Sequence, residues 1–171
     1  MAISLKKGEN TNLSNAAPGM TKMAVGLGWN ARATAGEEFD LDASAFMLNE
    51  ADKVSSDTHF IFYNQDASPE GSVKYMGDNR TGDGDGDDET IVIQLDRVPA
   101  NIEKISVCVT IHNAAERNQN FGQVSRAYVR VLNDANQQEV ARYDLSEDGS
   151  TEAAMIFGEV YRHNGEWKFK A

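Results

Sequence analysis

The chain has 171 residues, of which 40% are hydrophobic and 25% charged, a composition typical of a globular protein and unlike that of a disordered or collagenous chain. Its formal net charge of −11 argues against general affinity for nucleic acid, because binding to phosphate backbones requires a basic face. We therefore expect one domain over residues 1–171, with no nucleic acid among its partners.

The chain shows no signal for export or membrane insertion. The N-terminal stretch MAISLKKGENTNLS carries two lysines but lacks the apolar segment of a signal peptide. No run approaches the roughly 18 apolar residues that a spanning helix requires. The sequence predicts a soluble, intracellular protein without direct membrane insertion.

Alternation of apolar and polar residues is the dominant pattern and predicts about ten short strands. Trp29 and the glycines before it fall in the first of these, which indicates a strand with close backbone packing and lacks the glycine spacing of a phosphate-binding loop. The predicted strands are residues 23–29, 44–49, 59–64, 72–77, 90–95, 104–111, 127–133, 139–145, 153–162 and 166–171.

Turn signals join several of these strands. Asn164-Gly165 supplies the two positive-φ residues of a type I′ hairpin turn, and residues 133–138 form a second, longer hairpin loop. Helical patterning is scarce: residues 113–127 are the best candidate, and Gly122 limits them to a turn or two. Many short strands with turn-rich connections predict a mostly β fold, a two-sheet β-sandwich with a few short helices.

The segment GDNRTGDGDGDDE, residues 77–89, is the strongest functional signal. It holds five Asp, one Glu and one Arg, with four glycines that let backbone carbonyls turn outward. Calcium takes six to eight such oxygens at about 2.3 to 2.6 Å and tolerates irregular geometry, whereas magnesium requires strict octahedral geometry. Zinc fits poorly because the segment has no His or Cys. A solvated turn that only improves solubility is the alternative.

Known calcium motifs do not describe this segment. An EF-hand that starts at Asp83 would have Asp88 where glycine is needed and Gln94 at its last ligand position. The alternating Gly-Asp pattern of β-helical calcium repeats occurs once here, and such sites need stacked copies.

A second acidic cluster, EEFDLDAS, occupies residues 37–44. Asp40 and Asp42 are two residues apart, so on an extended strand both side chains point to one face and could hold a cation together. Asn64 and Asp66 have a similar spacing. Solvated surface residues are the alternative for each pair.

Five blocks in this order and spacing resemble the TerD family of tellurium-resistance and general stress proteins. They are VGLGWNAR, FDLDASAFML, GDNRTGDGDGDDE, VTIHNAAERNQNFGQV and EDGSTEAAMIFGEVYRHNGEWKF. Together they span essentially the whole chain, which makes the resemblance far more specific than any one motif. The resemblance implies a β-sandwich with two neighbouring calcium sites, and hence Ca²⁺ as cofactor, bound as two ions.

The resemblance also implies which residues bind the ions. The ligands carried over are Asp40, Asp42, Asp78, Asn79, Asp83, Asp87, Asp88 and Glu89. Asp85, Asn64 and a backbone carbonyl of Gly82 or Gly84 are further candidates, of which Asp85 falls at a more variable family position.

Two features depart from the family pattern. Asn113 stands where many relatives carry an acid, which puts a ligand role for that position in doubt. The chain stops at Ala171, where relatives commonly continue with a glycine-rich tail, so we expect either a short member or a truncated chain.

The resemblance further implies a bacterial cytoplasmic protein linked to tolerance of tellurite, phage and colicins. Its partners would be other tellurium-resistance proteins, including a TerC-like membrane protein that would bring this domain to the inner membrane by contact. We expect a calcium-organised sensing or interaction module.

Two other function classes remain as alternatives. A metal-dependent enzyme would need a base or nucleophile, but His59, His112 and His163 are scattered. Cys108 falls in a strand pattern that predicts a buried thiol, and it has no partner thiol. We expect no enzymatic activity. A calcium-dependent, lectin-like ligand site is the other alternative, although Trp29 and Trp167 are better explained by core packing.

Overall fold

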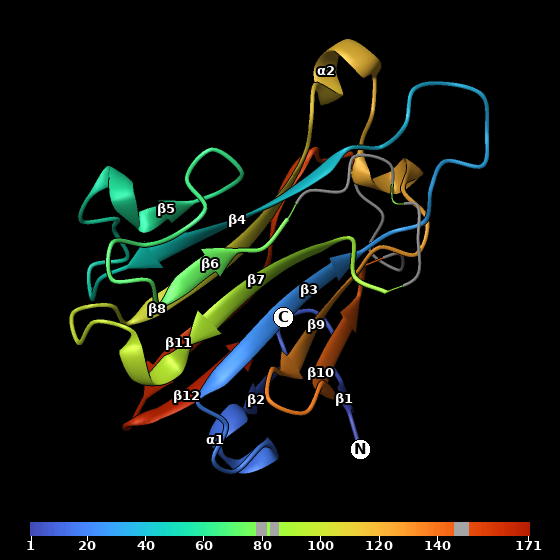
Figure 1. Ribbon diagram of the computed structural model, residues 1–171. Coiled ribbons are helices and arrows are strands. Elements are labelled where there is room, and N and C mark those ends of the chain that lie inside the picture. Colours follow the sequence, from blue (N-terminus) through green and yellow to red (C-terminus); the bar gives the residue numbers. More distant parts are fainter. Residues whose placement is uncertain (78–81, 83–85, 146–150) are drawn as a thin grey trace.

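The computed structural model describes residues 1–77, 82, 86–145 and 151–171, and it places two six-stranded sheets face to face (Figure 1). The first sheet consists, in spatial order, of β1 (Ile3–Ser4), β10 (Gln138–Asp144), β9 (Tyr128–Asn133), β3 (Lys22–Gly28), β7 (Glu89–Gln94) and β6 (Val73–Tyr75). The second consists of β2 (Asn10–Asn12), β12 (Glu166–Lys170), β11 (Ala154–His163), β8 (Lys104–Ile111), β4 (Leu41–Leu48) and β5 (Phe60–Ile61). This confirms the predicted two-sheet β-sandwich.

Helices are short and lie in the connections. They are α1 (Leu13–Ala16), α2 (Ala114–Arg117) and the 3-10 turns η1 (Asp57–His59), η2 (Leu95–Arg97) and η3 (Phe121–Gln123). The predicted helical stretch at 113–127 is therefore two separate short turns, because Asn118 adopts a left-handed conformation (φ 51°) that ends α2. No helix within the described part of the chain is long and apolar enough to cross a membrane.

The core lies between the sheets, and strand alternation explains which residues reach it. On β4 the inward positions are Leu41, Ala43, Ala45 and Met47, all buried, whereas Asp42 and Phe46 face outward and are half-buried. On β3, Met23, Val25 and Leu27 point inward in the same way. The side-chain period of two therefore decides that Asp42 lies on the outer face of its sheet.

Each of the ten predicted strands has a counterpart, and two more strands occur near the N-terminus. β1 and β2 are short edge strands, one paired parallel to β10 and the other antiparallel to β12. Their sequences are too short to show a period of two, so only tertiary pairing identifies them. The strand predicted at 59–64 is reduced to β5, because the chain turns back at Phe62 to bridge Gln65.

The turn between β11 and β12 has the predicted conformation. Asn164 and Gly165 have φ of 52° and 74°, the pair of positive values that a type I′ hairpin requires. An added Cβ at Gly165 would meet nothing within 4 Å, so only backbone conformation restricts the residue at this position.

We predict that Gly165→Ala lowers the free energy of unfolding by about 1 kcal/mol, because alanine pays the full steric cost of a left-handed backbone. Gly165→Asn is the matched control and should lose clearly less, since asparagine tolerates this conformation. Urea denaturation measures both. Equal losses for alanine and asparagine would contradict a conformational origin.

Candidate metal centre

Trp29 joins three segments at one end of the sandwich. Its backbone N–H donates to Asp88 Oδ2 (2.9 Å), and its indole N–H donates to the carbonyl oxygen of Phe39 (3.1 Å). Gly82, with φ of 73°, is buried against the same indole: an added Cβ there would lie 2.4 Å from the indole nitrogen. The buried tryptophan thus holds residues of the acidic segment 77–89 next to the residue that precedes Asp40.

Asp40 and Asp42 flank Leu41, where β4 begins, and both are half-buried. The backbone N–H of His112 donates to the carbonyl of Asp40 (2.7 Å), which fixes this strand entry against the end of β8. The His112 ring also lies beside Asp42, with 3.7 Å between Nδ1 and Oδ2. As predicted from the spacing, the two carboxylates lie on one side of the strand.

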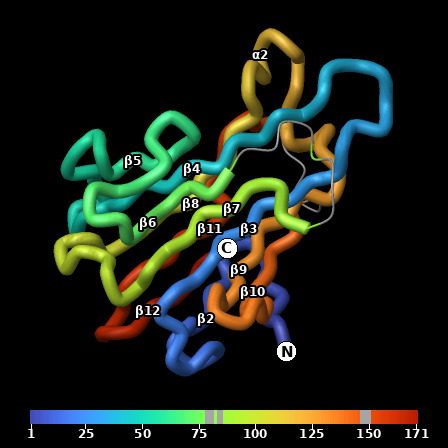
Figure 2. Tube along the Cα trace, viewed as in Figure 1, coloured from blue at the N-terminus to red at the C-terminus, as the bar shows by residue number. Residues whose placement is uncertain are grey.

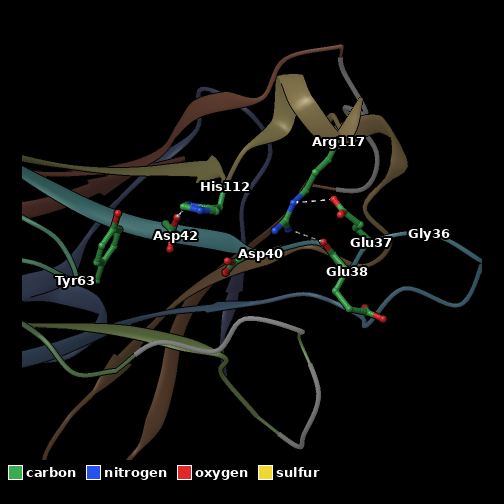
Figure 3. A pocket seen from close by; sticks show the side chains of 8 residues that line it. All are labelled: Gly36, Glu37, Glu38, Asp40, Asp42, Tyr63, His112 and Arg117. Carbon is green, nitrogen blue, oxygen red and sulfur yellow. Dashed lines mark hydrogen bonds and ion pairs between the residues drawn. The ribbon is translucent and has the colours of Figure 1, made fainter.

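A cavity of about 560 Å³ opens over these two aspartates. Figure 3 shows Arg117 reaching from α2 toward the Glu37 carboxylate and the Glu38 backbone, while the Glu38 side chain points away. Arg117 Nε lies 3.0 Å from Glu37 Oε2, and its Nη1 donates to the Glu38 carbonyl (3.3 Å). The carboxylate of Glu38 instead accepts from the backbone N–H of Arg32 (3.2 Å). One guanidinium thus shares the cavity with the carboxylates of Glu37, Asp40 and Asp42, so the cavity favours a cation.

Glu89 brings the opposite sheet to the same place. It is the first residue of β7, is buried, and its carboxylate accepts hydrogen bonds from the Ala43 N–H on β4 and from the Tyr75 hydroxyl (3.1 Å). Ala43 follows Asp42 directly. The buried carboxylate therefore ties the end of the acidic segment to the strand that carries the two aspartates, across the space between the sheets.

Asp87 points to the other face of the first sheet. Its Oδ1 accepts from Arg130 Nε (2.8 Å) and from the Tyr128 hydroxyl (2.9 Å), which also donates to the Gly86 carbonyl (3.0 Å). Partial burial of Arg130 disfavours its charged form, but the hydrogen bond from Arg130 to Asp87 and the charge of Asp87 outweigh this effect and raise the pKa of Arg130. Burial and the charge of Asp87 raise the pKa of Tyr128 to about 12.

Glycine makes room for this arrangement. A Cβ added at Gly26 would lie 2.0 Å from Asp87 Oδ2, and one at Gly28 would lie 2.4 Å from the Tyr128 ring. The close backbone packing predicted for this strand is therefore present, and its purpose is to seat the Asp87 carboxylate and the Tyr128 ring on the sheet.

We predict that Gly26→Ala displaces Asp87 from Arg130 and lowers the free energy of unfolding by about 2 kcal/mol through overpacking. Tyr128→Phe keeps the ring and removes only the hydroxyl, so it should cost about 1 kcal/mol. Chemical denaturation measures both variants. A Gly26→Ala protein as stable as the parent would show that Asp87 does not occupy this position.

The structure brings together some of the predicted ligands. Asp40, Asp42, Asp88 and Glu89 lie at the end of the sandwich held by Trp29, where Asp88 binds the Trp29 N–H and Glu89 binds the N–H of Ala43, whereas Asp87 is bound by Arg130 on the opposite face. Asn64 and Asp66 are exposed in the turn after β5. The predicted ligands Asp78, Asn79, Asp83, Gly84 and Asp85 lie outside the described residues.

Within the described ranges, no three His, Cys, Asp or Glu side chains are close enough to hold a metal ion by themselves. A complete ligand set would therefore need oxygens from residues 78–81 or 83–85 in addition to the aspartates of β4. The predicted ligands at this end, Asp40, Asp42, Asp88 and Glu89, all offer oxygens, which is the donor type that calcium takes.

Several residues of this site were not predicted as part of it. Trp29 was expected to serve the core, which it does, but its two hydrogen bonds also organise the acidic end. Tyr128 and Arg130 could have been found, because alternation along residues 127–133 places both on the outward face of one strand. Their pairing with Asp87 depends on tertiary structure.

The residues considered for catalysis do not meet. His59 is in η1, His112 follows β8, and His163 ends β11. Cys108 was predicted to be buried but is only half-buried, because it faces outward from β8. Burial of the thiol and the nearby charge of Glu159 raise its pKa to about 11, so it is a poor nucleophile at neutral pH.

We predict that Cys108 reacts with iodoacetamide at neutral pH about a hundredfold more slowly in the native protein than in the urea-unfolded chain. A raised pKa keeps the thiol protonated, so the native rate should climb about tenfold per pH unit until it levels off near pH 11. The unfolded chain is the control. Equal native and unfolded rates at neutral pH would contradict the raised pKa.

Comparison with known proteins agrees with this architecture. The TerD domain family model matches residues 1–171. The chain is 62% identical over 171 residues to the tellurium resistance protein TerD of Serratia marcescens, and the alignment covers 100% of this chain and 89% of that protein. It is 54% identical over 172 residues to general stress protein 16U of Bacillus subtilis (strain 168), with 100% and 89% covered.

A solved structure has the same fold. The crystal structure of a homologue of telluride resistance protein (TerD) from Streptomyces coelicolor A3(2) superposes with a TM-score of 0.72 at 23% identity, covering 89% of this chain and 88% of that one. The fold and the site thus define a two-sheet β-sandwich with an acidic end. The chain belongs to the TerD family of tellurium-resistance and general stress proteins.

Proposed function

We propose that this protein is a calcium-binding module of the stress response, in which the bound ions organise a surface for sensing or for interaction with partners. The observation that carries the proposal is that Trp29 and Glu89 tie the end of the acidic segment to the strand entry that carries Asp40 and Asp42. Fold alone would not support a function, so the site must do so.

Electrostatics gives calcium a definite role here. Carboxylates at close range repel each other, and a divalent cation offsets this repulsion while the glycines of the acidic segment free carbonyl oxygens for coordination. Asp40 and Asp42 would supply carboxylate oxygens from β4, and Asp88 would do so from the acidic segment. Asp87 would remain with Arg130 and anchor the segment on the outer face.

Binding would couple calcium to structure. An ion that binds only the folded state at one hundred times its Kd stabilises that state by about 2.7 kcal/mol. Since the acidic segment joins β6 to β7 and its Gly82 touches the Trp29 indole, an ion bound by this segment would also change the surface that this end of the sandwich presents.

We predict that the chelator-treated protein binds two calcium ions, measured by isothermal titration calorimetry with magnesium present as competitor. Asp40→Asn with Asp42→Asn should lose at least one ion. The matched control is Asp66→Asn with Asp96→Asn, which removes the same charge from two exposed positions and should keep both ions. Calcium that produces neither heat nor a rise in melting temperature would overturn the proposal, as would equal losses in the two variants.

Tryptophan fluorescence gives an independent readout of the same binding. The chain has two tryptophans, so Trp167→Phe leaves Trp29 as the sole reporter. Calcium should shift the emission of Trp29, because its indole contacts Gly82 of the acidic segment. The reverse variant, Trp29→Phe, leaves Trp167 as the control and should show no calcium-dependent shift.

The biological setting is part of the proposal. The relatives named above are tellurium-resistance and general stress proteins, which supports a role in tellurite tolerance in the bacterial cytoplasm. Partners would be other tellurium-resistance proteins, with a TerC-like membrane protein bringing the domain to the inner membrane by contact. We propose no catalytic activity, in keeping with the separation of the three histidines and the protonated state of Cys108.

A further inference from the structure

An apolar groove of about 720 Å³ crosses the outer face of the second sheet. Its floor includes a row of stacked rings from β4 and β5: the centroids of Phe46 and Phe60 are 4.4 Å apart, and those of Phe60 and Phe62 are 4.6 Å apart. On the far side, Ile156 of β11 is 60% exposed. Outward positions of a sheet are usually polar, so aromatic and aliphatic side chains gathered here indicate a contact surface.

Strand register makes this surface continuous. Ile156 pairs with Cys108 on β8, and Cys108 pairs with Ser44 on β4, so small side chains separate the exposed isoleucine from the stacked rings. Phe46 follows Ser44 by one outward step. The centre of the groove is therefore built on paired strands, and Phe62 and Tyr63 extend it from the turn after β5.

The groove runs into the acidic cavity described above. Asp42, Tyr63 and His112 line both, so the apolar floor and the acidic wall share one border (Figure 3). Beyond this border lie Glu37 and Glu38. From Asp42 to Phe46 along β4 is about 13 Å at the usual strand rise, long enough for a peptide segment and not only for a single side chain.

We propose that the groove and the acidic cavity together form a docking surface for a cationic amphipathic segment of another protein. Apolar side chains of the segment would lie on Phe46, Phe60 and Ile156, and its Lys or Arg residues would lie against Glu37 and Asp42. Charge complementarity sets this choice of partner. A second copy of the chain, with its net charge of −11, would bring like charge to the acidic wall.

This inference goes beyond the proposed function and does not depend on it. Its apolar half contains none of the candidate calcium ligands, and the test is run in chelator, where no calcium occupies Asp40 or Asp42. If the protein does not bind calcium, the peptide binding expected in chelator stays the same. If the peptide does not bind, the calcium titration expected for the protein alone stays the same.

The experiment uses a short fluorescent amphipathic peptide of leucine and lysine as probe, with fluorescence anisotropy as readout. The control peptide has glutamate in place of every lysine. We expect saturable binding of the lysine peptide that weakens with added salt, and no binding of the glutamate peptide. Equal binding of both peptides would overturn the charge argument.

Protein variants locate the contact. Ile156→Asp should weaken peptide binding about tenfold, which corresponds to about 1.4 kcal/mol. Met76→Asp is the matched control, because Met76 is also 60% exposed but lies at the end of β6 in the other sheet; it should bind as the parent does. Glu37→Lys should weaken binding and reduce its salt dependence. Unchanged binding in both groove variants would overturn the proposal.

Two further measurements keep the result interpretable. The melting temperature of each variant shows that the fold is retained, and calcium titration of Ile156→Asp and Met76→Asp shows that the metal centre is retained, as expected for exposed positions. Light scattering of the protein alone shows whether it associates with itself. Self-association that Ile156→Asp abolishes would identify a second copy of the chain as the occupant and overturn the proposed partner.

Discussion

The contacts of Trp29 are the constraint on which the acidic end of this protein depends. One buried indole is hydrogen-bonded to Phe39, lies against Gly82 and belongs to a residue whose N–H binds Asp88. Trp29 thereby joins its own strand end, the segment around Phe39 and the acidic segment. Because the last two carry like charges that repel each other, the neutral indole packed between them holds them together. The tryptophan keeps them at fixed distance, and the sandwich core fixes the tryptophan.

The end of the acidic segment is held on both faces of the first sheet. Asp87 is bound by Tyr128 and Arg130 on the outer face, while Glu89 reaches through the core to Ala43 of the opposite sheet. The side chains of Asp87 and Glu89, two residues apart, are thus held in opposite directions. This arrangement gives a segment rich in negative charge a rigid base, which a metal site needs for geometry that does not rearrange at each binding event.

The acidic cavity and the apolar groove share a border at Asp42, Tyr63 and His112. An ion at Asp42 would therefore change the charge seen by anything docked on the second sheet. Calcium and a cationic partner would act on the same carboxylate, and by thermodynamic linkage each would affect the affinity of the other equally. In such a module, a change in calcium concentration would change how tightly the partner binds, without a large conformational change.

The sequence alone predicts those features of the fold that depend on neighbouring residues, and it does not predict those that depend on contacts between distant segments. Strand alternation and the Asn-Gly turn are local properties, so the two-sheet fold, the strand ranges and the placement of Asp40 and Asp42 on one face could be predicted from short segments. The short strands β1 and β2 could not, because they exist only through pairing with β10 and β12.

The site divides in the same way. Residue chemistry was sufficient to propose calcium, because carboxylates and glycines attract hard cations in any fold. The pairing of Asp87 with Arg130, the burial of Glu89 beneath Ala43 and the groove between Phe46 and Ile156 join residues far apart in the chain. Sequence determined which groups are available, whereas tertiary structure decided which of them meet, because contacts between distant segments are set by the packing of the two sheets.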